Sequence, residues 1–342
     1  MKALVYKGPE IIELEDVTIP ILKKNELLLK VKKVGICGSD VEGYLGKTGR
    51  KNPSVIMGHE LAAIVEEVNN SKDFKKGDMV TVYPKLYCGD CKYCKDGLTN
   101  ICTNANFLGA FDENGGMAEY LAINKKYVIK INKINLKEAC MVEPLSVAYG
   151  AVSKINEDEL NNANNILVIG AGTIGLLILQ LLKLRGAKNV IVSDLFDYRL
   201  EKAKECGADY IINPQKENIL SKVKMLTDDN LIDISIEAVG LSKSAFQSIE
   251  LLKTHGTGIW VGNAQKIVEV DMQKIVTKEI KIIGSYFSTI EDFYSCLKII
   301  EEGKINFNAI ISCEKNLKDG KDIFKDLANN IEGKLIKVIL VN

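Results

Sequence analysis

The sequence predicts a two-domain α/β protein, in which an all-β, barrel-like domain is followed by a doubly wound parallel sheet. Three observations support this prediction. The chain has 342 residues, more than a single hydrophobic core usually spans. Short apolar runs fill its first third. After a polar, turn-prone stretch at Asn161–Asn165, expected strands and helices alternate, which is typical of a parallel sheet covered on both faces.

The first third contains short runs rich in Val, Ile and Leu. Clusters of Gly, Asn, Asp and Lys separate these runs, and few helical periods lie between them, so the pattern indicates a barrel. The expected strands are Ala3–Tyr6, Leu27–Val34, Leu61–Val68 and Met79–Tyr83.

In the middle of the chain, runs typical of strands alternate with segments that have the 3.6-residue period of helices. The expected strands are Ile166–Ile169, Val190–Ser193, Tyr210–Ile212, Ile232–Ile236 and Gly258–Val261. The expected helices are Gly175–Arg185, Tyr198–Cys206 and Ser242–Leu252. Further on, Phe293–Ile300 is an expected helix and Leu335–Val341 a last strand. We therefore expect a first domain of residues 1–145, completed by residues 286–342, around a second domain of residues 146–285.

Composition excludes some classes of protein. Lys+Arg and Asp+Glu both number 45, so no net charge directs the chain toward nucleic acid or an anionic membrane. The apolar start, Met1–Tyr6, is too short for a signal peptide. An odd count of nine cysteines argues against a disulfide framework and favours a reducing cytoplasm. We expect neither a nucleic-acid nor a membrane partner.

Four of the cysteines form a compact pattern, C-x2-C-x2-C-x7-C, made by Cys88, Cys91, Cys94 and Cys102. Thiolates are soft ligands that suit zinc, and zinc prefers four ligands in a tetrahedron. Because all four positions are cysteine, no coordination place stays open, and such closed sites are structural. The pattern predicts a structural zinc lobe.

A second candidate metal site is dispersed along the chain. Cys37 lies in Gly35–Asp40 (GICGSD), and His59 with Glu60 follows Gly58. A catalytic zinc needs about three protein ligands and one open position. A lone Cys or His usually packs, but the flanking glycines suit tight loops that bring side chains to one point.

Residues Gly170–Gly175 read G-x-G-x-x-G between an expected strand and an expected helix. Gly170 makes the tight turn, Gly172 admits a pyrophosphate, and Gly175 packs helix on strand, with Thr173 and Ile174 between them. Asp194 ends the next strand, 19 residues after Gly175. Its carboxylate can bond both ribose hydroxyls and would repel a 2′-phosphate, so we expect NAD rather than NADP.

Weaker candidates for cofactor contacts lie at later strand ends, where ligands bind in doubly wound sheets. Arg199 is the first basic residue after Asp194, and Tyr286 could reach the nicotinamide. The other candidates are Val239, Val261, Gly262 and Ser285.

Taken together, the motifs resemble the zinc-containing medium-chain dehydrogenases. GICGSD, MGHE at Met57–Glu60, the cysteine lobe and EPLSVAYGA at Glu143–Ala151 have that family's order and spacing. Within it, the chain is similar to the galactitol-1-phosphate and related polyol dehydrogenases. The resemblance implies a GroES-like barrel that carries the catalytic site, a Rossmann domain that binds NAD, two zinc ions per chain, and hydride transfer from a secondary alcohol.

The resemblance also implies roles for residues. Cys37 and His59 match two catalytic zinc ligands, and Glu143 matches a third group at the zinc, bound directly or through water. Glu60 matches an acidic neighbour of the metal, and Ser39 matches the hydroxyl that relays the alcohol proton.

Asp40 matches a carboxylate that orients the zinc-binding histidine. Cys140, three residues before Glu143, is a rival ligand, although we expect it to pack. A classical relay continues to a histidine shortly after the serine, and here Glu42 and Tyr44 stand there instead. The proton path beyond Ser39 is therefore open.

The identity of the substrate stays open. Lys47, Arg50 and Lys51 could hold a phosphate, or they form a solvated basic turn. Sorbitol, threonine and butanediol are alternatives to a polyol phosphate. Zinc-free reductases and non-catalytic relatives share the fold, but the Cys37, His59 and Glu143 set argues against both. The family suggests a homodimer or homotetramer.

Overall fold

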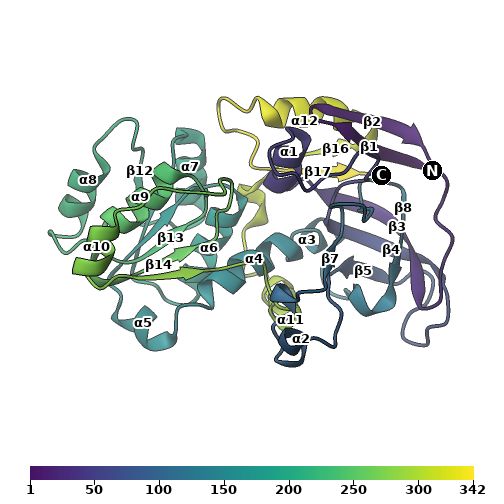
Figure 1. Ribbon diagram of the computed structural model, residues 1–342, viewed down its shortest axis with the longest axis horizontal. Helices are drawn as coiled ribbons and strands as arrows, with labels where there is room; N and C mark the ends of the chain where they lie inside the picture. The colour runs from purple at the N-terminus through teal and green to yellow at the C-terminus, as the bar shows by residue number, and fades with distance from the viewer.

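The computed structural model describes all residues from 1 to 342 and contains two sheet-based domains side by side (Figure 1). The Rossmann-type sheet lies on the left of the view and the barrel on the right, with α4 and α11 between them. No helix in the chain combines the length and the apolar character that crossing a membrane requires.

The barrel sheet draws its strands from both ends of the chain. Its order is β16-β17-β3-β4-β5-β9, and β8 also pairs with β3. All pairs are antiparallel except β16 with β17. The strands are β3 (Glu26–Gly35), β4 (Glu60–Val68), β5 (Met79–Val82), β8 (Tyr120–Asn124), β9 (Val128–Lys130), β16 (Ile311–Asn316) and β17 (Lys337–Val341).

Two small sheets and several helices complete this half of the molecule. The sheets pair β1 (Lys2–Gly8) with β2 (Ile11–Asp16) and β6 (Lys85–Leu86) with β7 (Asn106–Phe107). The helices are α1 (Gly38–Tyr44), α2 (Lys92–Lys95), α3 (Leu136–Ala139), α12 (Gly320–Ala328), and the 3-10 helices η1 (Thr99–Ile101), η2 (Lys125–Tyr127), η3 (Phe307–Ala309) and η4 (Leu317–Asp319). In Figure 1 the yellow C-terminal elements lie against the purple N-terminal strands.

The second domain is built on a parallel sheet of order β12-β11-β10-β13-β14-β15. Its strands are β10 (Asn165–Ile169), β11 (Asn189–Ser193), β12 (Tyr210–Ile212), β13 (Ile232–Glu237), β14 (Leu252–Trp260) and β15 (Lys281–Gly284). The helices are α5 (Glu157–Asn162), α6 (Thr173–Leu184), α7 (Asp197–Glu205), α8 (Ile219–Leu226), α9 (Ser242–Glu250) and α10 (Met272–Thr277). The expected doubly wound sheet is confirmed.

The central strand explains why the sheet is stable. Every residue of β10 is buried, as a parallel strand covered by helices on both faces must be. The chain leaves β10 toward β11 on one side and returns to β13 on the other. The carboxyl ends of β10 and β13 therefore flank the switch point, where ligands bind in this class of sheet.

Three helices of this domain, α5, α8 and α10, and the strand β15 were not predicted from the sequence. The longest of the three helices, α8, lies between β12 and β13. Ile219 and Val223 are buried while the lysines between and beyond them face outward, so the segment is amphipathic. Asn218 caps it by accepting a hydrogen bond from the Ser221 amide at 2.9 Å. The capping residue Asn218 and the apolar spacing of Ile219 and Val223 are visible in the sequence and could have predicted this helix.

Two helices join the domains. α4 (Val142–Val152) packs against α6 and against α11 (Ile290–Glu301), and all three are apolar on the packed side. One hydrophobic cluster runs without a break from barrel residues such as Tyr83 through α4 into the parallel sheet. The first turn of α4 is therefore held firmly at the junction.

Candidate active site and metal centres

Cys37 lies at the junction of β3 and α1, where it caps the helix. Its amide donates to Oδ2 of Asp40 at 3.3 Å, so the strand ends and the helix begins within three residues. Burial raises the pKa of the Cys37 thiol to about 11, and the nearby Glu60 carboxylate pushes it in the same direction. A bound cation would supply the charge that the thiolate needs in this position.

His59 stands directly before β4, after a glycine that no other residue could replace. Gly58 has a φ of +95°, and a Cβ there would lie 2.8 Å from the Met117 side chain. The Nδ1 atom of His59 is buried without a hydrogen bond; its nearest acceptor is Oδ1 of Asp40 at 3.7 Å. With Nδ1 facing a carboxylate, Nε2 is the nitrogen available to a metal.

Asp40 is fully buried and held by Lys51. The Lys51 Nζ lies 2.8 Å from Oδ1 of Asp40 and also donates to the Gly109 carbonyl. Burial opposes ionisation of Asp40, but the charges of Lys51 and His59 outweigh it and hold its pKa below the usual range. Lys51 is therefore buried against Asp40 rather than part of a solvated basic turn, and its alternative role as a phosphate ligand is not favoured.

Glu60 opens β4 and sits opposite Gly35 of β3. Its partner was not predicted from the sequence: Nζ of Lys337, in β17, bonds both Glu60 oxygens at 2.7 and 2.6 Å and the Ile36 carbonyl at 3.0 Å. The only signal for Lys337 was one charged residue at the start of an apolar run.

The structure brings three of the expected metal-site residues to one point. Ligand atoms of Cys37, His59 and Glu60 all lie within 4.8 Å of one another. This thiolate, imidazole and carboxylate set fits a zinc ion. Ser39 lies in the first turn of α1, exposed and next to Cys37.

Glu143 lies near this group but outside the set within 4.8 Å. It is buried in the first turn of α4, and its burial, opposed by His59 but reinforced by Glu60 and Cys37, raises its pKa well above the usual range. Its role as a third ligand stays a prediction. Its rival Cys140 donates to the Lys137 carbonyl at 3.1 Å in the core, as a packed thiol does.

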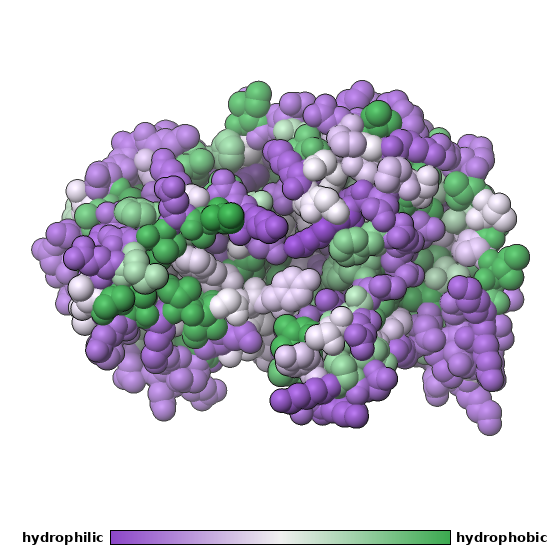
Figure 2. All heavy atoms as spheres, viewed as in Figure 1, coloured by the Kyte–Doolittle hydropathy of each residue, from purple (hydrophilic) through white to green (hydrophobic).

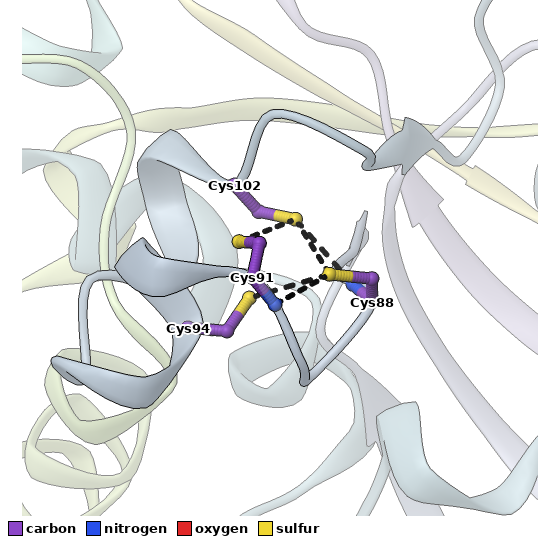
Figure 3. A group of neighbouring side chains, drawn as sticks. All are labelled: Cys88, Cys91, Cys94 and Cys102. Atoms are coloured by element: carbon purple, nitrogen blue, oxygen red, sulfur yellow. Dashed lines mark hydrogen bonds between the residues drawn. The ribbon is translucent and has the colours of Figure 1, made fainter.

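The four cysteines of the lobe point toward one centre (Figure 3). Sulfur atoms are 3.5 Å apart for Cys88 and Cys102, 3.8 Å for Cys91 and Cys102, and 3.9 Å for Cys88 and Cys94. Four thiolates at about 2.3 Å from a tetrahedral zinc would be separated by about 3.8 Å. The lobe therefore fits a zinc ion without rearrangement.

The glycine-rich loop connects β10 to α6 as expected. Gly170 adopts a φ of +99°, and a Cβ on Gly175 would lie 1.7 Å from the Gly170 carbonyl oxygen. Nothing lies within 4 Å of the Cβ position of Gly172, so its backbone faces open space. Ile174 follows in the first turn of α6, and Thr173 uses its hydroxyl to bond the Ile336 carbonyl at 3.0 Å.

Asp194 is anchored to this loop. Its Oδ2 accepts from the Ala171 amide at 2.7 Å, and Oδ1 accepts from the Phe196 amide at 2.9 Å. Arg199 stacks over the Phe196 ring at 5.0 Å and donates from Nε to the Gly333 carbonyl at 3.0 Å. The acidic residue therefore stands beside the expected pyrophosphate turn.

The remaining expected cofactor contacts lie at the carboxyl ends of the strands. Val239 follows β13, Val261 and Gly262 follow β14, and Ser285 follows β15. The Glu237 carboxylate organises this edge, since one of its oxygens accepts from both the Val239 and the Gly240 amides. Figure 2 shows the face hollowed between the two domains, where this edge meets the barrel.

Comparison with known proteins decides the family. Residues 173–302 match the zinc-binding dehydrogenases, and residues 23–133 match the alcohol dehydrogenase GroES-like domain. The chain is a zinc-binding dehydrogenase. Its membership of the medium-chain family, in the polyol branch, is confirmed.

The relatives of this zinc-binding dehydrogenase include curated polyol enzymes. Sorbitol dehydrogenase of Bacillus subtilis is 30% identical over 99% of this chain and 97% of its own length. D-arabitol-phosphate dehydrogenase of Enterococcus avium is 32% identical, covering 95% of this chain and 92% of the relative. The crystal structure of galactitol-1-phosphate dehydrogenase from Escherichia coli superimposes with a TM-score of 0.90 at 25% identity over 100% of both chains. This chain is accordingly an oxidoreductase that uses zinc and a nicotinamide cofactor.

Proposed function

We propose that this dehydrogenase oxidises a secondary alcohol of a polyol or polyol phosphate to a ketone, with NAD as the hydride acceptor. The observation that carries the proposal is the convergence of Cys37, His59 and Glu60 within 4.8 Å, beside the buried Glu143. A zinc there would have protein ligands and an open position, and the closed cysteine lobe would hold a second zinc.

Zinc would supply a Lewis acid that acidifies the alcohol, and the nicotinamide would supply the hydride acceptor. The protein holds the reactants in place. Asp40 keeps the imidazole of His59 oriented, with Lys51 on the same carboxylate oxygen. Lys337 bonds both oxygens of Glu60 and so holds this carboxylate in place beside Cys37 and His59. The hydroxyl of Ser39 takes the alcohol proton at the exposed start of α1.

NAD preference is proposed on the position of Asp194. Its carboxylate is fixed beside the glycine turn by the Ala171 amide. There it can accept from ribose hydroxyls and would repel a 2′-phosphate. We expect kcat/KM with NAD to exceed that with NADP by at least about tenfold, and an equal or better value with NADP would contradict this.

The substrate class is proposed by similarity. Relatives named for sorbitol, D-arabitol phosphate and galactitol 1-phosphate share the whole chain length. Threonine and butanediol remain alternative substrates. A zinc-free reductase or a non-catalytic protein is the alternative of a different class, and a homodimer or homotetramer is the proposed assembly.

Two measurements test the proposal. Metal analysis should find two zinc ions per chain, and a panel of polyols and polyol phosphates should reduce NAD. Cys37→Ser and His59→Ala should each abolish turnover while NAD binding, measured by calorimetry, survives. Cys313→Ser is the matched control, because this half-buried thiol lies in the same sheet without a metal partner. One zinc ion or none, or near-full activity in Cys37→Ser, would refute the site.

A further inference from the structure

Lys85 lies on the same side of its sheet as a ring that touches the candidate active site. In the β6–β7 pair, Lys85 is directly opposite Phe107, so both side chains project from one face. The Phe107 ring meets the His59 imidazole edge-on, with centroids 5.1 Å apart, and meets Phe287 at 5.5 Å. Lys85 thus borders the space in front of His59.

The ammonium group of Lys85 also faces the cofactor domain. Its Nζ lies 5.3 Å from the ring centroid of Tyr286, which follows β15 at the carboxyl edge of the parallel sheet. The Asn100 side chain fixes this segment by donating to the Tyr286 carbonyl at 2.9 Å. Lys85 therefore stands where the barrel meets the ligand-binding edge of the sheet.

Three lysines are largely buried in this half of the molecule, and two of them are paired. Lys337 bonds Glu60, and Lys51 bonds Asp40. Lys85 leaves only 9% of its surface exposed, yet no carboxylate oxygen lies within 4.0 Å of its Nζ and it donates no hydrogen bond within the chain.

The stem of the Lys85 side chain is buried, but its Nζ atom stays open to solvent, because His59 Nδ1 and Asn100 Oδ1 are the only buried side-chain nitrogen or oxygen atoms without a hydrogen-bond partner. The single contact with the Tyr286 ring is a cation–π interaction, which is weaker than an ion pair with a hydrogen bond. Since no carboxylate of the chain pairs with this ammonium group, it is free to bind an anionic group of a ligand in the space between the domains.

We infer that Lys85 binds the anionic group of the substrate, so that the enzyme prefers polyols carrying a phosphate ester or a carboxylate over neutral polyols. This inference rests on the proposed function and narrows it. Lys47 and Arg50 are exposed and Lys51 is already bonded to Asp40, whereas Lys85 is unpaired and lies opposite Phe107, the ring that contacts the imidazole.

The experiment compares matched charged and neutral substrates in the zinc-loaded enzyme. The pairs are galactitol 1-phosphate with galactitol and D-arabitol 1-phosphate with D-arabitol, and L-idonate is the carboxylate. In Lys85→Met, KM for the preferred anionic substrate should rise about 10- to 100-fold, the effect of losing one charged hydrogen bond. The kcat, the KM for NAD and the kinetics with neutral polyols should stay within about threefold.

Two further variants provide controls. Lys85→Arg keeps the charge and should retain KM within about fivefold. Lys30→Met removes a lysine that also stands over a tyrosine ring, Tyr120, but away from the site, and should change nothing. Lys85→Gln replaces the methionine variant if that protein does not fold. If the KM for the sugar phosphates responds to these variants, the anionic group is a phosphate ester. If the KM for L-idonate responds, it is a carboxylate.

Three results would overturn the inference: equal loss with charged and neutral substrates, a raised KM for NAD alone, or a wild-type enzyme without preference for anionic polyols. In each, oxidation of any polyol would leave the proposed function standing. If no polyol is oxidised, the proposed function fails. The anion site is then judged by thermal shift, where inorganic phosphate should stabilise the wild-type holoenzyme but not Lys85→Met, and equal shifts would refute it.

Discussion

The buried pair of Glu60 and Lys337 permits a sharp prediction about stability. The two side chains are 1% and 2% exposed, and two hydrogen bonds of 2.7 and 2.6 Å join them. Burial alone would lower the pKa of Lys337, but the Glu60 charge outweighs it and raises that pKa, so the lysine is charged at any ordinary pH. In the metal-free protein, Lys337→Met leaves an unpaired buried carboxylate, which should cost about 3–5 kcal/mol of unfolding free energy.

The double variant Glu60→Leu/Lys337→Met removes both charges and should recover most of this loss, because apolar replacement of a whole buried pair is often neutral. A surface pair, Lys321 with Glu13, provides the control. Its side chains are exposed, and Lys321→Met should cost less than about 1 kcal/mol.

Urea unfolding followed by far-UV circular dichroism measures the effect. Two domains need not unfold together. The one tryptophan, Trp260, lies in β14 and reports only the parallel sheet, so its transition should stay in place while the circular dichroism transition of the barrel shifts. Because the pKa of Lys337 is raised on folding, its contribution should be complete below about pH 10 and decline only above that. A cost below about 1 kcal/mol, or a double variant as unstable as the single one, would refute the reasoning.

Further predictions concern the lobe and the cofactor loop. Cys94→Ser should lower the zinc content from two ions per chain to one and open the lobe to limited proteolysis; an unchanged zinc content would contradict the closed site. Gly175→Ala should destabilise the parallel sheet, because the new Cβ would lie 1.7 Å from the Gly170 oxygen, whereas Gly172→Ala should fold normally and weaken NAD binding at least about tenfold by calorimetry. Asp194→Ala should lower kcat/KM with NAD and raise the NADP-to-NAD ratio, and an unchanged ratio would exclude Asp194 as the discriminating residue.

Features written in contiguous residues could be predicted from the sequence. The strands of the parallel sheet are short runs rich in β-branched residues, which predict strands directly. The cysteine lobe and the glycine loop are each formed by one short stretch of chain, so their residues are adjacent in the sequence as well as in space. The helices that were missed, α5, α8 and α10, have six, eight and six residues, lengths over which the 3.6-residue period is repeated too few times to stand out.

Partners that depend on tertiary register could not be predicted. Glu60 and Lys337 are separated by 277 residues, and only the antiparallel pairing of β17 with β3 brings them together. Lys51 was grouped with its basic neighbours because the sequence does not show that its side chain turns inward to Asp40. For Lys337 and for Lys51, the sequence shows a lysine but does not show which carboxylate it bonds.

The place of β17 has a consequence for how the protein matures in the cell. On the ribosome, β3 and β4 emerge early, but the neighbour of β3 on its other side is made last, after the whole parallel-sheet domain. Domains generally fold as units during synthesis. The parallel-sheet domain can therefore fold while the barrel still lacks its final strand, and Glu60 gains its buried partner Lys337 only after synthesis has reached residues 337–341.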